Sequence, residues 1–324
     1  MAATYLVTGA AGFIASKVCE FLLVDGNVVI GVDNLNNYYD VHLKQWRLNQ
    51  LYDRRGFSFY PLDIEDKRSL DKLFKMHKFD AVFNLAARAG VRASLEHPEL
   101  YHKTNVEGER NVLEIQVKHG VPKHVLASSS SLYAGCKMPF TEDLPVDKPQ
   151  SPYAETKKAA ELLAHEAHKK HGLDVSVLRY FTVFGPAGRP DMAPFRFIKW
   201  IDEGTPITIY GDGNQARDFT YVDDIAMGTV LAMMPVGYEI INLGGGRNPL
   251  TLLQVIRIIE KALGKKARLS FQPASAADMK ETHADVKKAR RLFGWAPAVS
   301  AEEGFKRTVV WHVEHRELVH GIKV

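Results

Sequence analysis

The first 33 residues of the chain place an apolar strand, a glycine-containing turn, a helix, a second strand and an aspartate in succession. Gly9 permits the tight turn after the strand at residues 5–7, and Gly12 lets a pyrophosphate approach the backbone at the helix N-terminus. Asp33 ends the second strand, where a carboxylate accepts hydrogen bonds from the adenosine ribose hydroxyls and repels a 2′-phosphate. This succession predicts a dinucleotide site for NAD rather than NADP.

Further apolar segments alternate with helical segments along the first 180 residues; they lie at 57–62, 79–87, 125–127 and 175–180. With the two strands around the glycine turn they make six, and their alternation with helices predicts an α/β fold with a doubly wound parallel sheet and right-handed crossovers. The carboxyl ends of such strands meet along one crevice, where these sheets bind ligands.

The composition changes from Phe184, and the stretch at 185–194, rich in Gly, Pro, Arg and Asp, reads as a loop that leaves the sheet. The segment at 240–243 reads as a strand that returns to the main sheet. We therefore predict a dinucleotide-binding domain made of residues 1–180 and about 222–246. A smaller, mixed α/β substrate lobe is predicted for residues 181–221 and 247–324.

Tyr153 and Lys157 are spaced i, i+4 in a segment that reads as a helix, so both side chains lie on one face. An ammonium beside a phenol favours the phenolate. Ser129 belongs to a run of serines that ends the buried strand at 125–127 and opens into the same crevice. These three residues are the predicted catalytic group, a proton-transfer site for a substrate hydroxyl.

Over residues 5 to about 295 the chain resembles the extended short-chain dehydrogenase/reductases that act on nucleotide-diphosphate sugars. The resemblance rests on the glycine turn, the serine run, the Tyr/Lys pair and the segments at 33–35, 84–87, 179–181, 217–219 and 221–224. Within that branch the segments at 33–40, 89–92 and 181–192 resemble the UDP-glucuronate 4-epimerases. The resemblance implies a Rossmann domain and a tightly bound NAD.

Three alternatives remain open at this level. UDP-galactose 4-epimerases usually carry Asn where Thr182 stands, and UDP-glucuronate decarboxylases usually carry Glu where Ser131 stands. Dehydratases of this branch carry an Asp-Glu pair at Ser130 and Ser131. A neutral-sugar epimerase, a decarboxylase and a non-catalytic NAD-binding scaffold are therefore kept as rivals of the uronate epimerase.

The resemblance implies that the sugar C4 hydride passes to NAD and returns to the opposite face of a 4-keto intermediate. The residues expected to hold NAD are Gly9, Gly12, Phe13, Ile14, Asp33, Asn34, Asp63, Ile64, Leu85, Ala86, Ala87, Tyr153, Lys157 and Tyr180. The residues expected to bind the UDP-sugar are Arg88, Arg92, Ser129, Ser130, Ser131, Thr182, Arg189, Arg217 and Asp278.

Roles follow for some of the substrate residues. Thr182 and Arg189, with the serines at 130 and 131, are expected to hold the uronate carboxylate, because an arginine grips a carboxylate in a two-pronged way. Arg217 is expected at the diphosphate and Asp278 at the uridine ribose. Arg88 stands where relatives mostly carry an uncharged residue, and the sequence gives no account of it.

The composition agrees with a small anionic substrate. The net charge of +4 gives no case for nucleic acid, and no apolar run is long enough for a membrane span. With two cysteines, a reducing cytoplasm is the expected setting. His312, His315 and His320 fit no compact metal site and are expected on a solvated helix. The resemblance implies a homodimer through helices beginning near residues 105 and 154.

Overall fold

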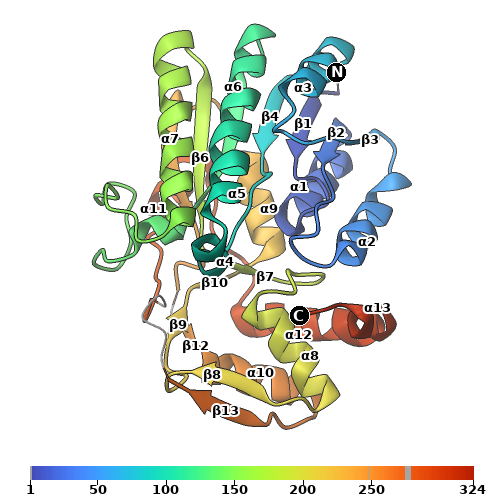
Figure 1. The fold of residues 1–324 in the computed structure, drawn as a ribbon, viewed down its shortest axis with the longest axis vertical. Helices are drawn as coiled ribbons and strands as arrows, with labels where there is room; N and C mark the ends of the chain where they lie inside the picture. The colour runs from blue at the N-terminus through green and yellow to red at the C-terminus, as the bar shows by residue number, and fades with distance from the viewer. Residues whose placement is uncertain (1, 248, 274–278) are drawn as a thin grey trace.

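The computed structural model describes residues 2–247, 249–273 and 279–324. Its centre is a seven-stranded parallel sheet in the order β11-β6-β5-β4-β1-β2-β3 (Figure 1). The strands are β1 (Thr4–Thr8), β2 (Val28–Asp33), β3 (Phe57–Pro61), β4 (Ala81–Asn84), β5 (Lys123–Ser129), β6 (Asp174–Tyr180) and β11 (Tyr238–Leu243). The predicted doubly wound parallel sheet is confirmed, and β11 is the strand expected to return to it.

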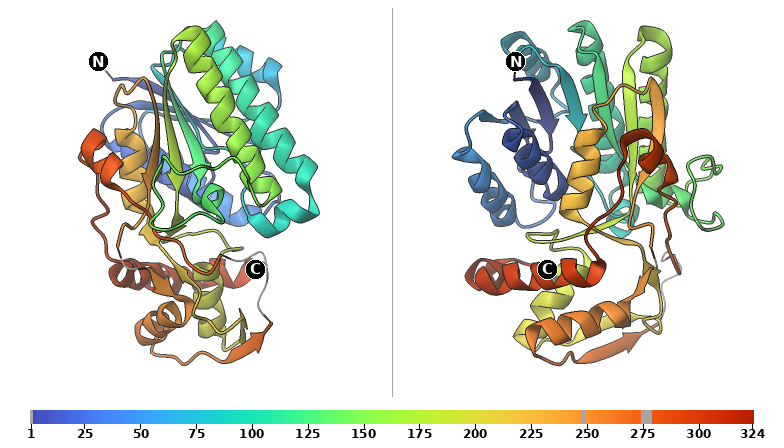
Figure 2. Two further views of the ribbon diagram at one scale, coloured as in Figure 1. Left: turned by 90° about the vertical axis from the view of Figure 1, so that its left-hand side faces the viewer. Right: turned by 180° about the vertical axis from the view of Figure 1, so that it is seen from behind.

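Helices cover both faces of this sheet. One layer holds α1 (Phe13–Val24), α2 (Val41–Tyr52), α9 (Val222–Leu231) and α11 (Lys287–Phe293). The opposite layer holds α3 (Lys67–Met76), α6 (Gly108–Lys118) and α7 (Pro152–His171), and α6 and α7 lie side by side across it (Figure 2). Because both faces are covered, strand β5 is buried at every residue, which explains its apolar run at 125–127.

The strand order creates the crevice that the sequence predicts. After β3 the chain crosses to the other side of β1 and enters β4, so the connections that leave β1 and β4 diverge. Ligands bind at such a switch point, outside the carboxyl ends of the strands. Two short helices, α4 (Val91–Glu96) and α5 (Pro98–His102), a π-helical turn at Lys103–Glu107 and a 3₁₀ turn at Ser130–Tyr133 line this end of the sheet.

A second group of elements lies below the carboxyl ends of the strands (Figure 1). Its helices are α8 (Ala193–Glu203), α10 (Leu252–Leu263), α12 (Ala301–Glu314) and α13 (Arg316–Gly321). Its strands pair in twos and are β7 (Thr182–Phe184), β8 (Ile207–Tyr210), β9 (Ala216–Arg217), β10 (Phe219–Tyr221), β12 (Leu250–Thr251) and β13 (Leu269–Gln272). Phe184, Phe197, Ile259 and Phe305 belong to a separate apolar core there. The exact domain boundaries stay a prediction, since α11 contacts β11 although it follows residue 247.

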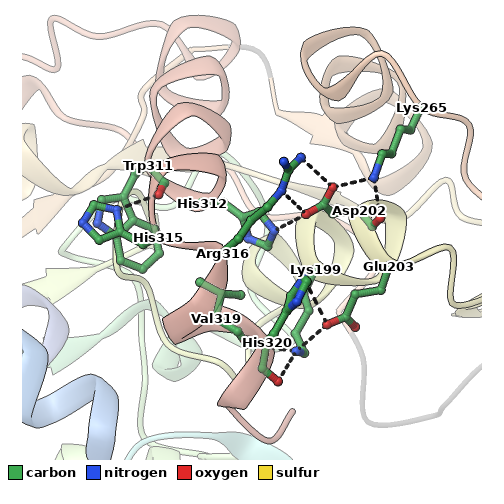
Figure 3. A network of polar contacts seen from close by, with 10 residues as sticks. All are labelled: Lys199, Asp202, Glu203, Lys265, Trp311, His312, His315, Arg316, Val319 and His320. Atoms are coloured by element: carbon green, nitrogen blue, oxygen red, sulfur yellow. Dashed lines mark hydrogen bonds and ion pairs between the residues drawn. The ribbon is translucent and has the colours of Figure 1, made fainter.

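A buried carboxylate fixes the C-terminal helices to α8 (Figure 3). Asp202 accepts hydrogen bonds from Lys265 at 2.7 Å, His312 at 3.1 Å and Arg316 at 2.9 Å. Burial acts to raise the pKa of the Asp202 carboxyl, but these three donors outweigh it and hold the pKa well below its usual range. Lys199 adds a hydrogen bond to the carbonyl of Val319. The carboxylate therefore ties α12 and α13 to α8.

His312 corrects one expectation from the sequence. The side chain is buried beside Asp202, so its assignment to a solvated face is wrong. The spacing gives no warning of this, because Asp202 lies 110 residues away. Among the residues that the structure describes, no cluster of His, Cys, Asp and Glu could hold a metal ion. Within the described residues, no helix is long and apolar enough to cross a membrane.

Candidate active site

A pocket opens at the carboxyl ends of β1, β2, β3 and β4. Ten of the residues that the sequence assigns to cofactor or substrate line it, namely Gly9, Gly12, Asp33, Asn34, Asp63, Ile64, Leu85, Ala86, Ala87 and Arg88. These residues come from the ends of four different strands and the loops that follow them. The structure thus brings the predicted dinucleotide residues together at the switch point of the sheet.

The two glycines of the turn are required by close backbone contacts. Gly9 has a φ of +71°, and a Cβ on it would lie 2.9 Å from the backbone nitrogen of Ala86. A Cβ on Gly12 would lie 2.8 Å from the carbonyl oxygen of Gly9. The turn and the loop after β4 therefore approach so closely that neither position accepts a side chain.

Asp33 is held from several sides. Its Oδ1 accepts the backbone amide of Leu35 at 2.8 Å, and its Oδ2 accepts that of Ala11 at 3.3 Å. Lys44 Nζ lies 3.7 Å from Oδ1. Burial lowers the pKa of Lys44, while Asp33 opposes that effect. The carboxylate is thus oriented jointly by its own loop and by the glycine turn.

Two cations on α2 belong to this site and are absent from the sequence assignments. Lys44 faces Asp33, and Arg47 donates to the carbonyls of Ala11 at 3.0 Å and Ala187 at 2.7 Å. Arg47 thereby joins the glycine turn to the loop after β7. Their i, i+3 spacing places both on one face of the helix, but the sequence alone does not reveal that this face turns inward.

Tyr153, Lys157 and Ser129 lie together below the end of β5. Ser151 caps α7 by accepting the amide of Ala154 at 3.2 Å, which places Tyr153 in the first turn of the helix. Burial raises the pKa of Tyr153, and the side-chain hydrogen bond with Ser129 works against that. Lys157 Nζ donates to the carbonyl of Ala127 at 2.9 Å, and burial lowers the pKa of Lys157 to about 8.

The pKa of Tyr153 therefore differs from the expectation of a phenol already activated by lysine. Burial dominates the pKa of Tyr153, and the charge that favours its phenolate is that of Arg189 rather than Lys157. The catalytic residues are adjacent, but an activated phenolate requires a further positive charge.

Arg189 acts electrostatically on Tyr153 and is itself paired with a carboxylate. Its Nε donates to Asp191 at 3.0 Å, Nη2 forms an ion pair with the same carboxylate, and Nη2 also lies 3.3 Å from the carbonyl oxygen of Ala89. Its guanidinium lies 5.6 Å from the centre of the Tyr38 ring. Burial acts to lower the pKa of Arg189, but Asp191 outweighs it and raises that pKa. Arg189 is therefore a fixed cation with its two-pronged face on an internal carboxylate.

The serines occupy the turn that follows β5. Ser129 Oγ accepts the amide of Ser131 at 3.1 Å, and Ser130 lies in the same buried turn. Ser128 donates to Glu161 at 2.6 Å, and Glu161 is in turn paired with Arg179 at 2.8 Å. This buried ion pair, which the sequence analysis did not identify, supports the turn from below.

The remaining predicted residues are more scattered. Arg92 lies 4.9 Å from the centre of the Tyr210 ring on β8, and Arg217 Nη1 donates to the carbonyl of its neighbour Ala216 at 2.8 Å. Thr182 begins β7, where it pairs with β10. Tyr180 bonds Thr229 of α9 at 2.8 Å, and Phe13 and Ile14 form the first turn of α1. Asp278 lies outside the described residues.

Comparison with known proteins identifies the family. Residues 5–244 match the NAD dependent epimerase/dehydratase family. The chain belongs to this family. It is 58% identical to a UDP-glucuronate 4-epimerase of Thermodesulfobacterium geofontis over 99% of both chains. The resemblance stated from the sequence is therefore confirmed at the level of the family.

Solved structures agree. The UDP-glucuronic acid 4-epimerase from Bacillus cereus, in complex with UDP-glucuronic acid and NAD, is 37% identical with a TM-score of 0.90, over 96% of this chain and 99% of that one. A UDP-glucose 4-epimerase from Thermotoga maritima with UDP-glucose is 32% identical with a TM-score of 0.88, over 97% of this chain and 99% of that one. Uronate and neutral-sugar epimerases thus share this fold.

Proposed function

We propose that the protein is a UDP-glucuronate 4-epimerase that interconverts UDP-glucuronate and UDP-galacturonate through a transient 4-keto sugar. The observation that carries the proposal is the position of Arg189: its Nη2 and the Tyr101 hydroxyl both contact the carbonyl of Ala89, at 3.3 and 3.1 Å, and the Tyr101 ring packs edge-on against Tyr153 with 6.1 Å between the ring centres. A base for the sugar hydroxyl and a partner for the uronate carboxylate are thereby adjacent. The 58% identical relative with this activity supports the same assignment.

The residues of the pocket fit NAD. The turn at Gly9 and Gly12 leaves backbone room for a pyrophosphate, and the oriented carboxylate of Asp33 suits the ribose hydroxyls. NAD, when bound, supplies the hydride acceptor and a positively charged nicotinamide ring. Arg88 lines this pocket together with Lys44, so we assign Arg88 to the cofactor side of the site rather than to the sugar.

Tyr153 is the proposed base for the sugar 4-hydroxyl, with Ser129 as its hydrogen-bonding partner. Burial raises the pKa of Tyr153. A positive charge near the phenol favours the phenolate and so opposes that rise. Lys157 contributes a charged neighbour on the same helix face as long as it stays protonated. The proton taken from the hydroxyl returns to the sugar oxygen when the hydride is returned.

Arg189 is proposed to exchange its internal partner for the substrate. Asp191 and a uronate offer the same two-oxygen geometry to the guanidinium, so the substrate carboxylate can replace Asp191 without loss of hydrogen bonds. Holding that carboxylate matters because a 4-keto uronate is a β-keto acid and loses CO₂ when the C–C bond aligns with the carbonyl. Ser130, Ser131 and Thr182 are the proposed additional contacts. Arg92 and Arg217 are proposed for the diphosphate, and Asp278 for the uridine ribose.

Two further proposals concern assembly and setting. We propose that two copies pair through α6 and α7, a proposal supported by the exposed Leu162 on α7, which is 57% accessible. Light scattering of the purified protein tests it, because a monomeric mass would contradict it. We also propose a cytoplasmic setting, since Cys19 and Cys136 are both free thiols.

One incubation tests the proposed function. Purified protein is mixed with UDP-glucuronate without added NAD, and the sugar nucleotides are separated. UDP-galacturonate is the expected product. A UDP-pentose with CO₂ identifies a decarboxylase instead, and turnover of UDP-galactose but not of UDP-glucuronate identifies a neutral-sugar epimerase.

A further inference from the structure

Two loops that line the NAD pocket are joined to each other by a side-chain hydrogen bond. The loop after β2 contributes Asn36 and Tyr38 to the pocket, and the loop after β4 contributes residues 85–88. The Tyr38 hydroxyl donates to the carbonyl of Ala89, the next residue of the second loop. The pocket is therefore bordered by two segments that this bond ties together, although its partners lie 51 residues apart in the chain.

Both partners of this bond are presented by backbone that is itself held. The amide of Tyr38 donates to Asn36 Oδ1 at 3.1 Å. On the other loop, Asn105 Oδ1 accepts the amide of Arg88 at 2.8 Å, and Asn105 Nδ2 donates to the carbonyl of Arg88 at 2.9 Å. Because each backbone is held next to the contact, forming the bond to Ala89 orders little beyond the Tyr38 side chain.

Gly90 leaves the space in which the bond forms. It has a φ of +114°, and a Cβ on it would lie 2.6 Å from the Tyr38 hydroxyl oxygen. The Tyr101 hydroxyl and Arg189 Nη2 also contact the carbonyl of Ala89, at 3.1 and 3.3 Å. Of these three side chains, Tyr38 is the one that lines the NAD pocket. The same carbonyl thus meets the cofactor side through Tyr38 and the proposed substrate side through Arg189.

We propose that Tyr38 is a cofactor-retaining residue: its hydroxyl holds the loop after β2 against the loop after β4, and the two loops separate before NAD leaves. The family uses NAD, so this inference goes beyond the proposed function and does not depend on which sugar the site takes. A ligand in a pocket between two joined loops dissociates only as fast as the loops open. Tyr38 thereby sets the rate of NAD release.

The rate of NAD exchange tests this without any substrate. Protein loaded with NAD is mixed with an excess of radiolabelled NAD, and the label carried by the protein is counted after rapid desalting. Tyr38→Phe removes the hydroxyl but keeps the ring, whose centre lies 5.6 Å from the guanidinium of Arg189. We expect exchange to be about two- to tenfold faster than in wild type, the range for one lost hydrogen bond. Exchange at the wild-type rate would overturn the proposal.

Tyr101→Phe is the matched control. It removes a hydroxyl from the same carbonyl of Ala89, but Tyr101 lies on α5 and does not line the pocket. Because the Tyr101 side chain is 1% exposed, a general loosening of these contacts would appear in Tyr101→Phe at least as strongly as in Tyr38→Phe. We expect NAD exchange at the wild-type rate in Tyr101→Phe. Equal acceleration in the two variants would mean that the carbonyl needs donors for stability alone, which contradicts the role of Tyr38.

The outcomes separate this inference from the proposed function. Faster NAD exchange in Tyr38→Phe but not in Tyr101→Phe, in a protein that leaves UDP-glucuronate unchanged, refutes the proposed function and leaves the role of Tyr38 standing. Wild-type exchange in Tyr38→Phe, in a protein that epimerises UDP-glucuronate, refutes the role of Tyr38 alone.

Discussion

The two sides of the candidate active site differ in how far they are formed before ligands bind. On the cofactor side, Gly9 and Gly12 are in close backbone contact with their surroundings, and the carboxylate of Asp33 is oriented by one amide of its own loop and one of the glycine turn. On the substrate side, the cation that should meet the sugar acid, Arg189, is bound to Asp191. The backbone shapes the cofactor side, whereas the arginine proposed for the substrate carboxylate is paired with an internal carboxylate.

This difference has a physical reason. A cofactor that stays bound through every turnover is best held by backbone geometry, which costs no rearrangement. A substrate must enter and leave, and a partly buried arginine without a partner would be costly in its absence. We propose that Asp191 pairs with Arg189 between turnovers. Substitutions on the cofactor side should therefore weaken NAD binding, whereas substitutions on the substrate side should change the kinetics with UDP-glucuronate.

The largest effect is expected where the two sides meet. Tyr153→Phe removes the proposed base but keeps the ring, so turnover should fall by about 10²- to 10⁴-fold while NAD stays bound. Activity on UDP-glucuronate and the absorbance of protein-bound nucleotide are measured on the same sample. Retained turnover would refute the base assignment, and loss of the nucleotide would show that the phenol serves mainly to hold the cofactor.

A substitution in the glycine turn should remove the cofactor. Gly9→Ala places a Cβ 2.9 Å from the backbone of Ala86 at a φ of +71°, so we expect loss of bound NAD and about 1–3 kcal/mol of stability. Gly26→Ala is the matched control, because Gly26 has a φ of +79° but no atom within 4 Å of its Cβ. If both variants keep NAD equally well, close approach at Gly9 does not shape the site.

Substitution of Arg189 should change the preference between UDP-glucuronate and a neutral UDP-sugar. Arg189→Ala removes charged hydrogen bonds worth about 1.5–3 kcal/mol, so kcat/KM for UDP-glucuronate should fall by about 10- to 100-fold. NAD binding should not change. UDP-galactose, which lacks the carboxylate, serves as the comparison substrate. Equal losses on the two substrates would reject Arg189 as the carboxylate partner.

The smallest effect is expected from substitution of Asp191, the carboxylate that pairs with Arg189. Asp191→Asn weakens a partly exposed ion pair worth up to about 1 kcal/mol, so KM for UDP-glucuronate should fall by up to about fivefold. Steady-state kinetics at constant ionic strength measure this. A higher KM would mean that Asp191 holds Arg189 in its productive position and does not compete with the substrate.

The same contrast decides what the sequence could predict. The glycine turn, Asp33 and the Tyr153/Lys157 pair are local patterns whose spacing specifies their geometry, and the fold class and family that follow from them are confirmed. The assignment of individual site residues stays a prediction. Its cofactor part is well supported, because most of those residues line one pocket.

What the sequence did not reveal depends on distant partners. Arg47 reaches a carbonyl 140 residues away, and His312 reaches Asp202 across 110 residues. Glu109 lies on a helix whose sequence looks like any charged surface segment, and only the fold places it against His124. Spacing along the chain carries no information about such pairs. These buried polar contacts are also where substitutions will be hardest to interpret from sequence alone.

We propose that C4 of the sugar transfers a hydride to bound NAD and that the same hydrogen returns to C4. UDP-glucuronate deuterated at C4 tests this most directly, with the products analysed by mass spectrometry and NMR. We predict UDP-galacturonate that keeps its deuterium at C4 when the reaction runs in ordinary water without added NAD. Product that has exchanged this deuterium for solvent hydrogen would contradict the account.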